Sequence, residues 1–333
     1  MKLLINCPLN FGINNKLSNK LGGIETLNIE LAKKFVLSDL NITLASNCKI
    51  KKKIKNILNL PIHIIKKNSN NYHFDVIISS NDSTIFDYFP QSKKILWLHN
   101  PLQIEKSFRK KQFFSIIKND INTVFVSDYL DKITSKLYFF KKRLVIPNFL
   151  PRVFTDNIII KKRKPIFVWS VQRGKGLNDT IEMWIKNINT IHPDAKFYIM
   201  GIDKLPNKLK TKYLKSKNIF HLGRVSKNRL RNIYIKSTAM ICLGYDETFC
   251  LNAIEANSCG LPVISFGKTA LNELVKNSYN GFIVKDFIDL SKKITYLLKS
   301  NNKKKVQLIN NCIKYSKKFS LNNIFYIWLK LLK

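Results

Sequence analysis

The sequence predicts an α/β protein that consists of two doubly wound, parallel β-sheets. Three observations support this fold class. The chain has 333 residues, about the length of two ordinary domains. Short apolar runs alternate with longer amphipathic stretches along most of the chain. A stretch rich in proline and lysine, residues 147–164, separates one alternating series from the next and is typical of a linker between domains.

The predicted strands are short apolar runs with many β-branched side chains. Parallel strands that are buried on both faces have this composition. In the first half they are residues 3–6, 42–46, 76–79, 95–98, 124–127 and 144–146, and in the second half residues 166–170, 196–200, 219–222, 239–243, 263–266 and 282–284.

Three helices are predicted with particular clarity between these strands. Residues 23–36 carry apolar side chains at helical spacing directly after Gly22 and Gly23. Residues 178–190 repeat this pattern. Residues 249–258 form a third helix, which Cys259, Gly260 and Pro262 bring to an end.

The two series predict two Rossmann-like domains, residues 1–160 and 161–318, that face a central cleft. Ligands of such sheets bind beyond the carboxyl ends of the strands, so functional residues are expected in the loops that follow them. The apolar, aromatic tail at residues 319–333 fits either a helix that packs back on the first domain or a contact with a membrane.

The chain carries 58 lysines and arginines against 21 acidic residues, a net charge of +37. Such a charge attracts polyanions, yet it is dispersed, and no RNA- or DNA-binding module is visible. Two interpretations stay open: a genome whose composition favours lysine codons, or a protein that works at an anionic membrane surface.

The six cysteines include no C-x-x-C pair, so no zinc site is expected, and free thiols fit a reducing cytosol. The N-terminus is too short and too broken in hydropathy for a signal peptide. No apolar run approaches the roughly 20 residues that cross a bilayer. We therefore expect a cytoplasmic protein, and any contact with the membrane to be peripheral.

The strongest motif contains two glutamates, Glu247 and Glu255, separated by seven residues. Glu247 is expected at the end of a buried strand and Glu255 within the next helix. Carboxylates placed in this way accept hydrogen bonds from sugar hydroxyls. Alternatively, Glu247 stabilises the N-terminus of that helix and Glu255 lies on a solvated face.

Three further sites follow predicted strands. Gly22 and Gly23 precede the first helix, where a backbone can approach a phosphate closely or simply form a tight turn. Arg173 and Lys175 follow residues 166–170, where cations can stabilise a departing diphosphate. His99 follows residues 95–98 and fits either an active-site role or a structural one.

Residues 219–290 resemble the E-x7-E region of retaining glycosyltransferase family 4, which has the GT-B fold. The resemblance rests on the two glutamates, on the sequence from Gly260 to Val263, and on the sequences Glu273-Leu-Val and Asn280-Gly-Phe-Ile-Val. It implies that the first domain binds the acceptor and the second the nucleotide sugar. It also implies that Glu255 binds the ribose hydroxyls and that Glu247 faces the donor sugar.

The resemblance extends to the other candidate residues. It implies that Gly22, Gly23, Arg173 and Lys175 contact the donor diphosphate and that His99 lies near the transferred sugar. Arg224 and Val225 are expected against the base, and Thr248 and Phe249 beside the nucleotide sugar. The family usually places its arginine five residues before this lysine, where the chain has Ser170, so how Arg173 and Lys175 divide the binding of the phosphates stays open.

The function implied is the transfer of a sugar, with retention of configuration, from a UDP- or GDP-sugar to a glycan or lipid-linked acceptor during synthesis of cell-surface polysaccharide or lipopolysaccharide. No cofactor and no metal are expected, because no D-x-D motif follows a strand. The leaving phosphate itself is the base implied for the acceptor hydroxyl. The alternatives are an inactive binding module with the GT-B fold and a basic nucleic-acid-binding protein.

Overall fold

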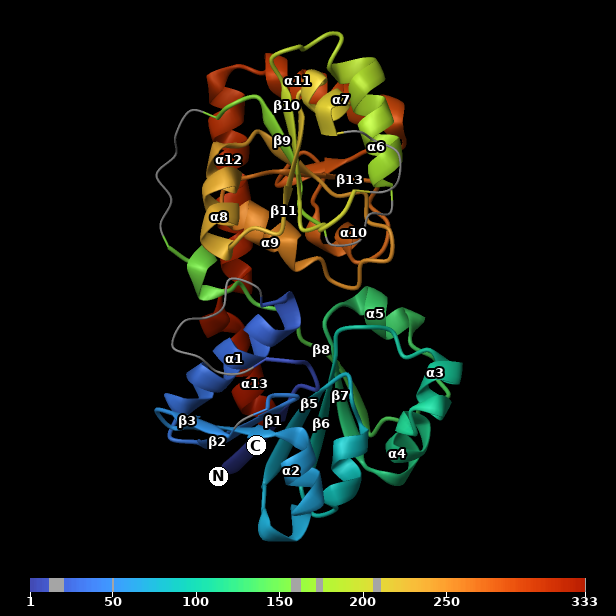
Figure 1. The fold of residues 1–333 in the computed structure, drawn as a ribbon, viewed down its shortest axis with the longest axis vertical. Coiled ribbons are helices and arrows are strands. Elements are labelled where there is room, and N and C mark those ends of the chain that lie inside the picture. Colours follow the sequence, from blue (N-terminus) through green and yellow to red (C-terminus); the bar gives the residue numbers. More distant parts are fainter. Residues whose placement is uncertain (12–20, 50, 157–162, 172–175, 206–210, 333) are drawn as a thin grey trace. The chain divides into compact units, whose positions relative to one another are not determined.

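The computed structural model describes residues 1–11, 21–49, 51–156, 163–171, 176–205 and 211–332, and it divides into two compact units (Figure 1). Unit 1 consists of Met1–Phe149 and Leu321–Lys333, and unit 2 of Leu150–Ser320. The predicted fold class, two doubly wound α/β domains, is confirmed. The boundary lies about ten residues before the expected one at residue 160.

Unit 1 contains an eight-stranded sheet in the order β3-β4-β2-β1-β5-β6-β7-β8. Its strands are β1 (Lys2–Asn6), β2 (Asn41–Ser46), β3 (Lys52–Ile54), β4 (Ile57–Pro61), β5 (Val76–Ser80), β6 (Lys93–Leu98), β7 (Ile121–Phe125) and β8 (Lys142–Val145). The sequence did not predict β3 and β4, and β3 runs antiparallel to β4, so the sheet is not wholly parallel. Strand prediction relies on buried apolar runs, and two of the three residues of β3 are exposed lysines. This edge strand was therefore not predicted.

The helices of unit 1 follow its strands. They are α1 (Gly23–Val36), α2 (Ile62–Lys67), α3 (Ile104–Arg109), α4 (Gln112–Lys118), α5 (Asp128–Ile133) and α13 (Leu321–Leu332), with short 3-10 turns at Ser69–Asn71 and Thr84–Tyr88. The Ser127 hydroxyl caps α5 by accepting a hydrogen bond from the Leu130 amide at 3.0 Å.

Helix α13 brings the C-terminal end of the chain into the core of unit 1. Trp328 is fully buried, and its ring lies 4.9 Å from that of Trp97 on β6. Phe325 lies 5.1 Å from Phe35 of α1. These apolar side chains of the tail are covered by protein, so they do not form the membrane contact that the sequence left open.

Unit 2 contains a six-stranded sheet in the order β11-β10-β9-β12-β13-β14, and all its described pairings are parallel. The strands are β9 (Ile166–Trp169), β10 (Lys196–Met200), β11 (Ile219–Gly223), β12 (Ala239–Ile241), β13 (Val263–Ser265) and β14 (Gly281–Ile283).

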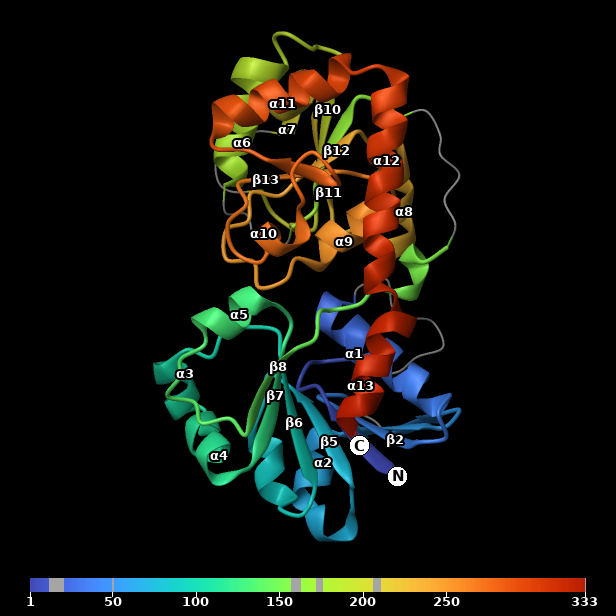
Figure 2. The ribbon, with the colours of Figure 1, turned by 180° about the vertical axis from the view of Figure 1, so that it is seen from behind.

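The helices of unit 2 cover both faces of this sheet: α8, α9 and α12 lie on one side and α6 on the other (Figures 1 and 2). They are α6 (Leu177–Met183), α7 (Thr211–Ser216), α8 (Lys227–Lys236), α9 (Leu251–Ser258), α10 (Leu271–Leu274), α11 (Phe287–Lys299) and α12 (Asn302–Ser316), with 3-10 turns at Arg152–Phe154 and Lys317–Phe319. The helix predicted at 178–190 continues from α6 as a π-helical segment, Trp184–Ile188. This segment buries Trp184 against Phe167 and Phe197.

The order of the strands fixes where each sheet can bind a ligand. In unit 1 the chain winds outward from β1 in one direction and from β5 in the other, and in unit 2 from β9 and β12. The crevice at the carboxyl ends of two such strands is the usual ligand site of an open α/β sheet. The segments after β9 and β12 are those that carry the candidate residues of unit 2.

Candidate functional site

The segments that follow β9 and β12 are joined by hydrogen bonds. The side-chain amide of Asn252, in the first turn of α9, donates to the backbone oxygen of Ser170, directly after β9. The Ser170 hydroxyl lies 2.5 Å from the hydroxyl of Tyr234, which α8 contributes. Three elements of unit 2 therefore meet at the carboxyl edge of the sheet.

Glu255 lies in the middle of α9 and is fully buried. Its Oε1 atom accepts a hydrogen bond at 2.5 Å from the ammonium of Lys227, the first residue of α8. Its Oε2 atom has no hydrogen-bond partner among the described residues. The interpretation that Glu255 occupies a solvated face is wrong, because the helix turns it inward between α8 and the sheet.

The ionisation of Glu255 depends on this contact. Burial raises the pKa of the Glu255 carboxyl, and the Lys227 ammonium opposes that rise through its charge and its hydrogen bond. The pKa of Tyr234 is raised well above its usual value, mainly by burial and further by the charge of Glu255. Only Lys227 among these three side chains is part exposed, at 29%.

Lys227 was not among the residues selected from the sequence. Lys227 is one of 58 basic residues in a chain of net charge +37, so nothing in its local sequence distinguished it from the others. Its partner could be found only from the fold, since 28 positions separate it from Glu255. The lysine is further placed by Phe154, whose ring centre lies 5.5 Å from its ammonium.

Glu247 lies in the loop between β12 and α9, six residues after the strand ends. The N-cap of α9 is Cys250, so Glu247 does not cap that helix. Its backbone oxygen accepts a hydrogen bond of 3.2 Å from the Ala270 amide. Asp246 and Cys250 both have a positive φ, 58° in each case, which gives the loop a compact, bent path.

The neighbours of Glu247 occupy different environments. Thr248 is half-buried in the same loop, whereas Phe249 is almost completely buried and lies 6.0 Å from the ring of Phe319. In this structure Phe249 therefore belongs to the packing of unit 2.

Arg173 and Lys175 lie outside the described residues. The adjacent Gly176 is described and has a φ of +79°. A Cβ atom there would lie 2.7 Å from both Leu243 and Tyr245 of the β12–α9 loop. Only glycine permits this close approach, so the backbone at Gly176 is packed against the loop that carries Glu247.

Arg224 and Val225 follow β11 and precede α8. The Arg224 guanidinium forms an ion pair of 3.1 Å with Asp203, and both side chains are largely exposed. Val225 is half-buried, two residues before Lys227.

In unit 1, Gly22 is the N-cap of α1 and Gly23 its first residue. The Gly22 backbone is extended, with φ −72° and ψ 176°, so its conformation does not require glycine. Its carbonyl accepts hydrogen bonds from the amide and the hydroxyl of Thr26.

His99 directly follows β6 and is 5% exposed. Its backbone amide and that of Asn100 both donate to Oδ1 of Asn81, at 2.8 and 3.1 Å. Burial lowers the pKa of the imidazole to about 3, so the ring is neutral at physiological pH. Its ring lies 4.4 Å from that of Trp97.

A buried neutral network fills the region where β1 and β5 end. The Asn6 amide donates to the Ser79 hydroxyl at 2.9 Å. The Ser80 hydroxyl donates to Oδ1 of Asn28, which lies on the buried face of α1. Sequence analysis missed this network, although an asparagine on the apolar face of α1 was a usable signal.

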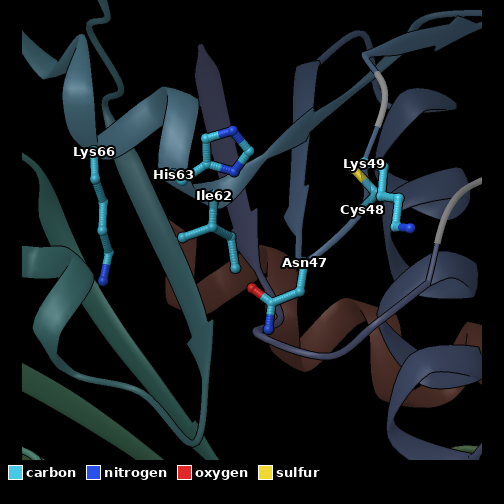
Figure 3. A pocket seen from close by; sticks show the side chains of 6 residues that line it. All are labelled: Asn47, Cys48, Lys49, Ile62, His63 and Lys66. Atoms are coloured by element: carbon cyan, nitrogen blue, oxygen red, sulfur yellow. The ribbon is translucent and has the colours of Figure 1, made fainter.

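A cavity of about 490 Å³ lies at the carboxyl ends of β2 and β4 in unit 1 (Figure 3). It is lined by Asn47, Cys48, Lys49, Ile62, His63 and Lys66. Lys66 donates a hydrogen bond of 3.2 Å to the Thr84 hydroxyl. Among the described residues that line the cavity there are two lysines and no acidic residue, which suits an anionic group.

Among the described residues, no group of three or more histidine, cysteine, aspartate and glutamate side chains could hold a metal ion. In the same part of the chain, no helix is both long and apolar enough to span a bilayer.

Sequence comparison relates the chain to known proteins. Residues 155–319 match the family model of glycosyl transferases group 1. An uncharacterized glycosyltransferase of Methanocaldococcus jannaschii is 31% identical over 160 residues, 46% of the chain and 43% of the relative. A UDP-Gal:α-D-GlcNAc-diphosphoundecaprenol α-1,3-galactosyltransferase of Escherichia coli is 31% identical over 129 residues, 37% of the chain and 33% of the relative. The chain thus spans less than half the length of these curated relatives.

Solved structures are similar over essentially the whole chain. The lipopolysaccharide glycosyltransferase WaaG has a TM-score of 0.73 at 11% identity, with complete coverage of both chains. A Rickettsia africae glycosyltransferase has a TM-score of 0.75 at 16% identity, covering 100% of this chain and 97% of its own. Anabaena HepE, solved with UDP and glucose, has a TM-score of 0.73 at 14% identity, covering 100% and 99%. At these identities the likeness shows the fold, which is GT-B, and the match to glycosyl transferases group 1 is confined to residues 155–319.

Proposed function

We propose that the protein is a retaining glycosyltransferase that uses a UDP- or GDP-sugar as its donor. The observation that carries this proposal is the fully buried Glu255 carboxylate of α9, a helix whose first turn bonds to the end of β9. Lys227 holds one of its oxygens, and the other accepts no hydrogen bond from the described residues. A carboxylate so placed is a strong acceptor for the two hydroxyls of a ribose.

The Glu255 carboxylate is fully buried, so a neighbouring side chain must move for the ribose to reach it. Lys227 is the part-exposed side chain among its contacts, and a lysine side chain changes rotamer on a timescale far shorter than turnover. We propose that the Lys227 side chain swings aside as the nucleotide enters.

The remaining roles are those that the resemblance to the family implies. Glu247, in the loop beside Glu255, is proposed to face the donor sugar. Arg173 and Lys175 are proposed to neutralise the diphosphate as it departs, with the leaving phosphate accepting the proton of the acceptor hydroxyl. Gly22, Gly23 and His99 are proposed to contribute from unit 1, and no metal ion is needed in this scheme.

The relatives support the choice of donor and acceptor. The Escherichia coli relative is named for a UDP-galactose donor and a diphosphoundecaprenol-linked acceptor, and Anabaena HepE was solved with UDP and glucose. We propose a UDP- or GDP-sugar donor and a glycan or lipid-linked acceptor in cell-surface polysaccharide or lipopolysaccharide synthesis. The enzyme would then work at the cytoplasmic face of the membrane.

The test is a calorimetric titration of the protein with UDP, GDP, ADP and CMP at moderate salt. We expect one diphosphate to bind selectively and Glu255→Gln to weaken its binding. Glu182→Gln, an exposed carboxylate change in the same unit, is the matched control. The anomeric configuration of the product, measured by NMR with the cognate donor, then tests retention.

Two other outcomes would replace this function. Selective nucleotide binding without transfer to any glycan acceptor would indicate an inactive binding module. Salt-sensitive binding of RNA or DNA, without selectivity among the nucleotides, would indicate a basic nucleic-acid-binding protein.

A further inference from the structure

Exposed apolar side chains are concentrated in one part of unit 1. Of the 18 large apolar residues that are exposed among the described residues, eight lie between Ile104 and Val145, about an eighth of the chain. The others are scattered along the sequence. Exposed apolar patches on soluble proteins mark surfaces that meet a partner or a membrane.

Helices α3 and α4 carry the densest part of this patch. Ile104 and Phe108 lie one turn apart on α3, and Phe114 and Ile117 lie one turn apart on α4, so each pair shares a helix face. The rings of Phe108 and Phe114 lie 5.6 Å apart, and that of Phe113 lies 4.2 Å from Phe108. We call these five residues the aromatic surface.

The buried side chain of Tyr138 supports the aromatic surface. Tyr138 is buried, donates a hydrogen bond of 2.7 Å to the Ser107 hydroxyl of α3, and lies 5.7 Å from the Phe113 ring. Its neighbours Leu137 and Phe139 are exposed by 57% and 73%. Both ribbon views show α3 and α4 together at one edge of unit 1 (Figures 1 and 2). The exposed rings thus belong to an ordered surface that extends to this loop.

The same two helices are strongly basic. Between residues 104 and 118 the exposed charged side chains are one acid, Glu105, and five bases: Lys106, Arg109, Lys110, Lys111 and Lys118. Cations beside exposed aromatic and aliphatic side chains are the combination that binds a bilayer with anionic headgroups. On surfaces of this kind, the aromatic rings enter the interfacial layer of the bilayer, and the ammonium groups stay beside the lipid phosphates.

We propose that the aromatic surface and its lysines form the face that docks on an anionic phospholipid bilayer. The proposal deepens the membrane-side function suggested above by naming the contact, but it needs no transferase activity. Single-stranded nucleic acid fits less well, because isoleucine and leucine offer no ring on which a base can stack.

The test is co-sedimentation of the full chain with phosphatidylcholine vesicles, with and without phosphatidylglycerol, at physiological salt. Lys110→Glu/Lys111→Glu is compared with Lys303→Glu/Lys304→Glu, which makes the same charge change in the first turn of α12. Phe108→Ser/Phe114→Ser is compared with Tyr326→Ser, an exposed aromatic of α13. Circular dichroism melts establish that each variant is folded.

We expect binding only to the anionic vesicles, weakened about tenfold or more by the Lys110 and Lys111 change and by less than about twofold by the α12 control. The phenylalanine variant should also weaken binding, and Tyr326→Ser should not. Equal weakening by both lysine pairs would refute a specific surface, as would full binding by the phenylalanine variant. Absence of vesicle binding by the unaltered chain, even with selective nucleotide binding intact, would overturn the proposal and leave the donor site standing.

Discussion

The polar contacts at the carboxyl edges of the two sheets differ in charge. In unit 2 the fully buried Glu255 carboxyl pairs with the part-exposed ammonium of Lys227, whereas in unit 1 a buried network of amides and hydroxyls joins Asn6 to Ser79 and Asn28 to Ser80. His99 in unit 1 is likewise kept neutral by burial.

The difference has a physical meaning. Burying a carboxylate lowers the stability of a protein unless the carboxylate is paired with a cation. A buried carboxylate therefore indicates a place where its charge has a function. Amides and hydroxyls are cheaper to bury when they bond to one another. The comparison supports the proposal that unit 2 recognises the nucleotide, and four experiments test it.

The largest effect is expected from Trp328→Ala in α13. Removing a fully buried indole leaves a cavity beside Trp97 and should lower the free energy of unfolding by about 3–5 kcal/mol. Hydrogen exchange should show lost protection in β1, β5 and β6 and unchanged protection in β9 and β12. Equal loss in both sheets would show that the units unfold together and are not independent.

Glu255→Gln should have the next largest effect. The amide keeps the shape but loses the charge, and a hydrogen bond to a charged group contributes about 1.5–3 kcal/mol. Affinity for the preferred nucleotide should therefore fall roughly 10- to 100-fold by calorimetry. An unchanged dissociation constant in a folded variant would remove the ribose role of Glu255.

His99 should make the stability of unit 1 depend on pH. The pKa of the imidazole is about 3 in the folded protein and near 6.5 in the unfolded chain. The free energy of unfolding therefore decreases as the pH falls below 6.5. The loss reaches about 2 kcal/mol at pH 5 relative to neutral pH. Denaturant unfolding at pH 5, 6 and 7.5 measures it, and His99→Phe should remove this slope whatever its absolute stability.

Lys227→Met should have the smallest effect at neutral pH and a clear one in acid. Without the ammonium, nothing opposes the rise that burial gives to the pKa of Glu255. Nucleotide binding should therefore fail at a higher pH than in the unaltered protein, and Lys227→Arg should restore the profile. Titrations between pH 5 and 8 check this, and superimposable profiles for Met and Arg would mean that Lys227 only fills space.

Local patterns determined much of the architecture. All twelve predicted apolar runs overlap strands, because a parallel strand buried on both faces must be apolar along its length. The helix at Gly23–Val36 was found for a similar reason, since its buried face repeats at helical spacing. Glu247 and Glu255 were selected from the sequence for their seven-residue spacing, and His99 because it follows a predicted strand.

Only the tertiary structure decided what these residues touch. It paired Glu255 with Lys227, buried Trp328 against Trp97, and left the rings of α3 and α4 exposed. The exposed lysines of β3 and Lys227 of α8 look alike in sequence, because one charge among many has no periodic pattern of its own. Contacts across 28 or more positions depend on how the sheet winds, and this is why the sequence determined the elements while the fold determined the site.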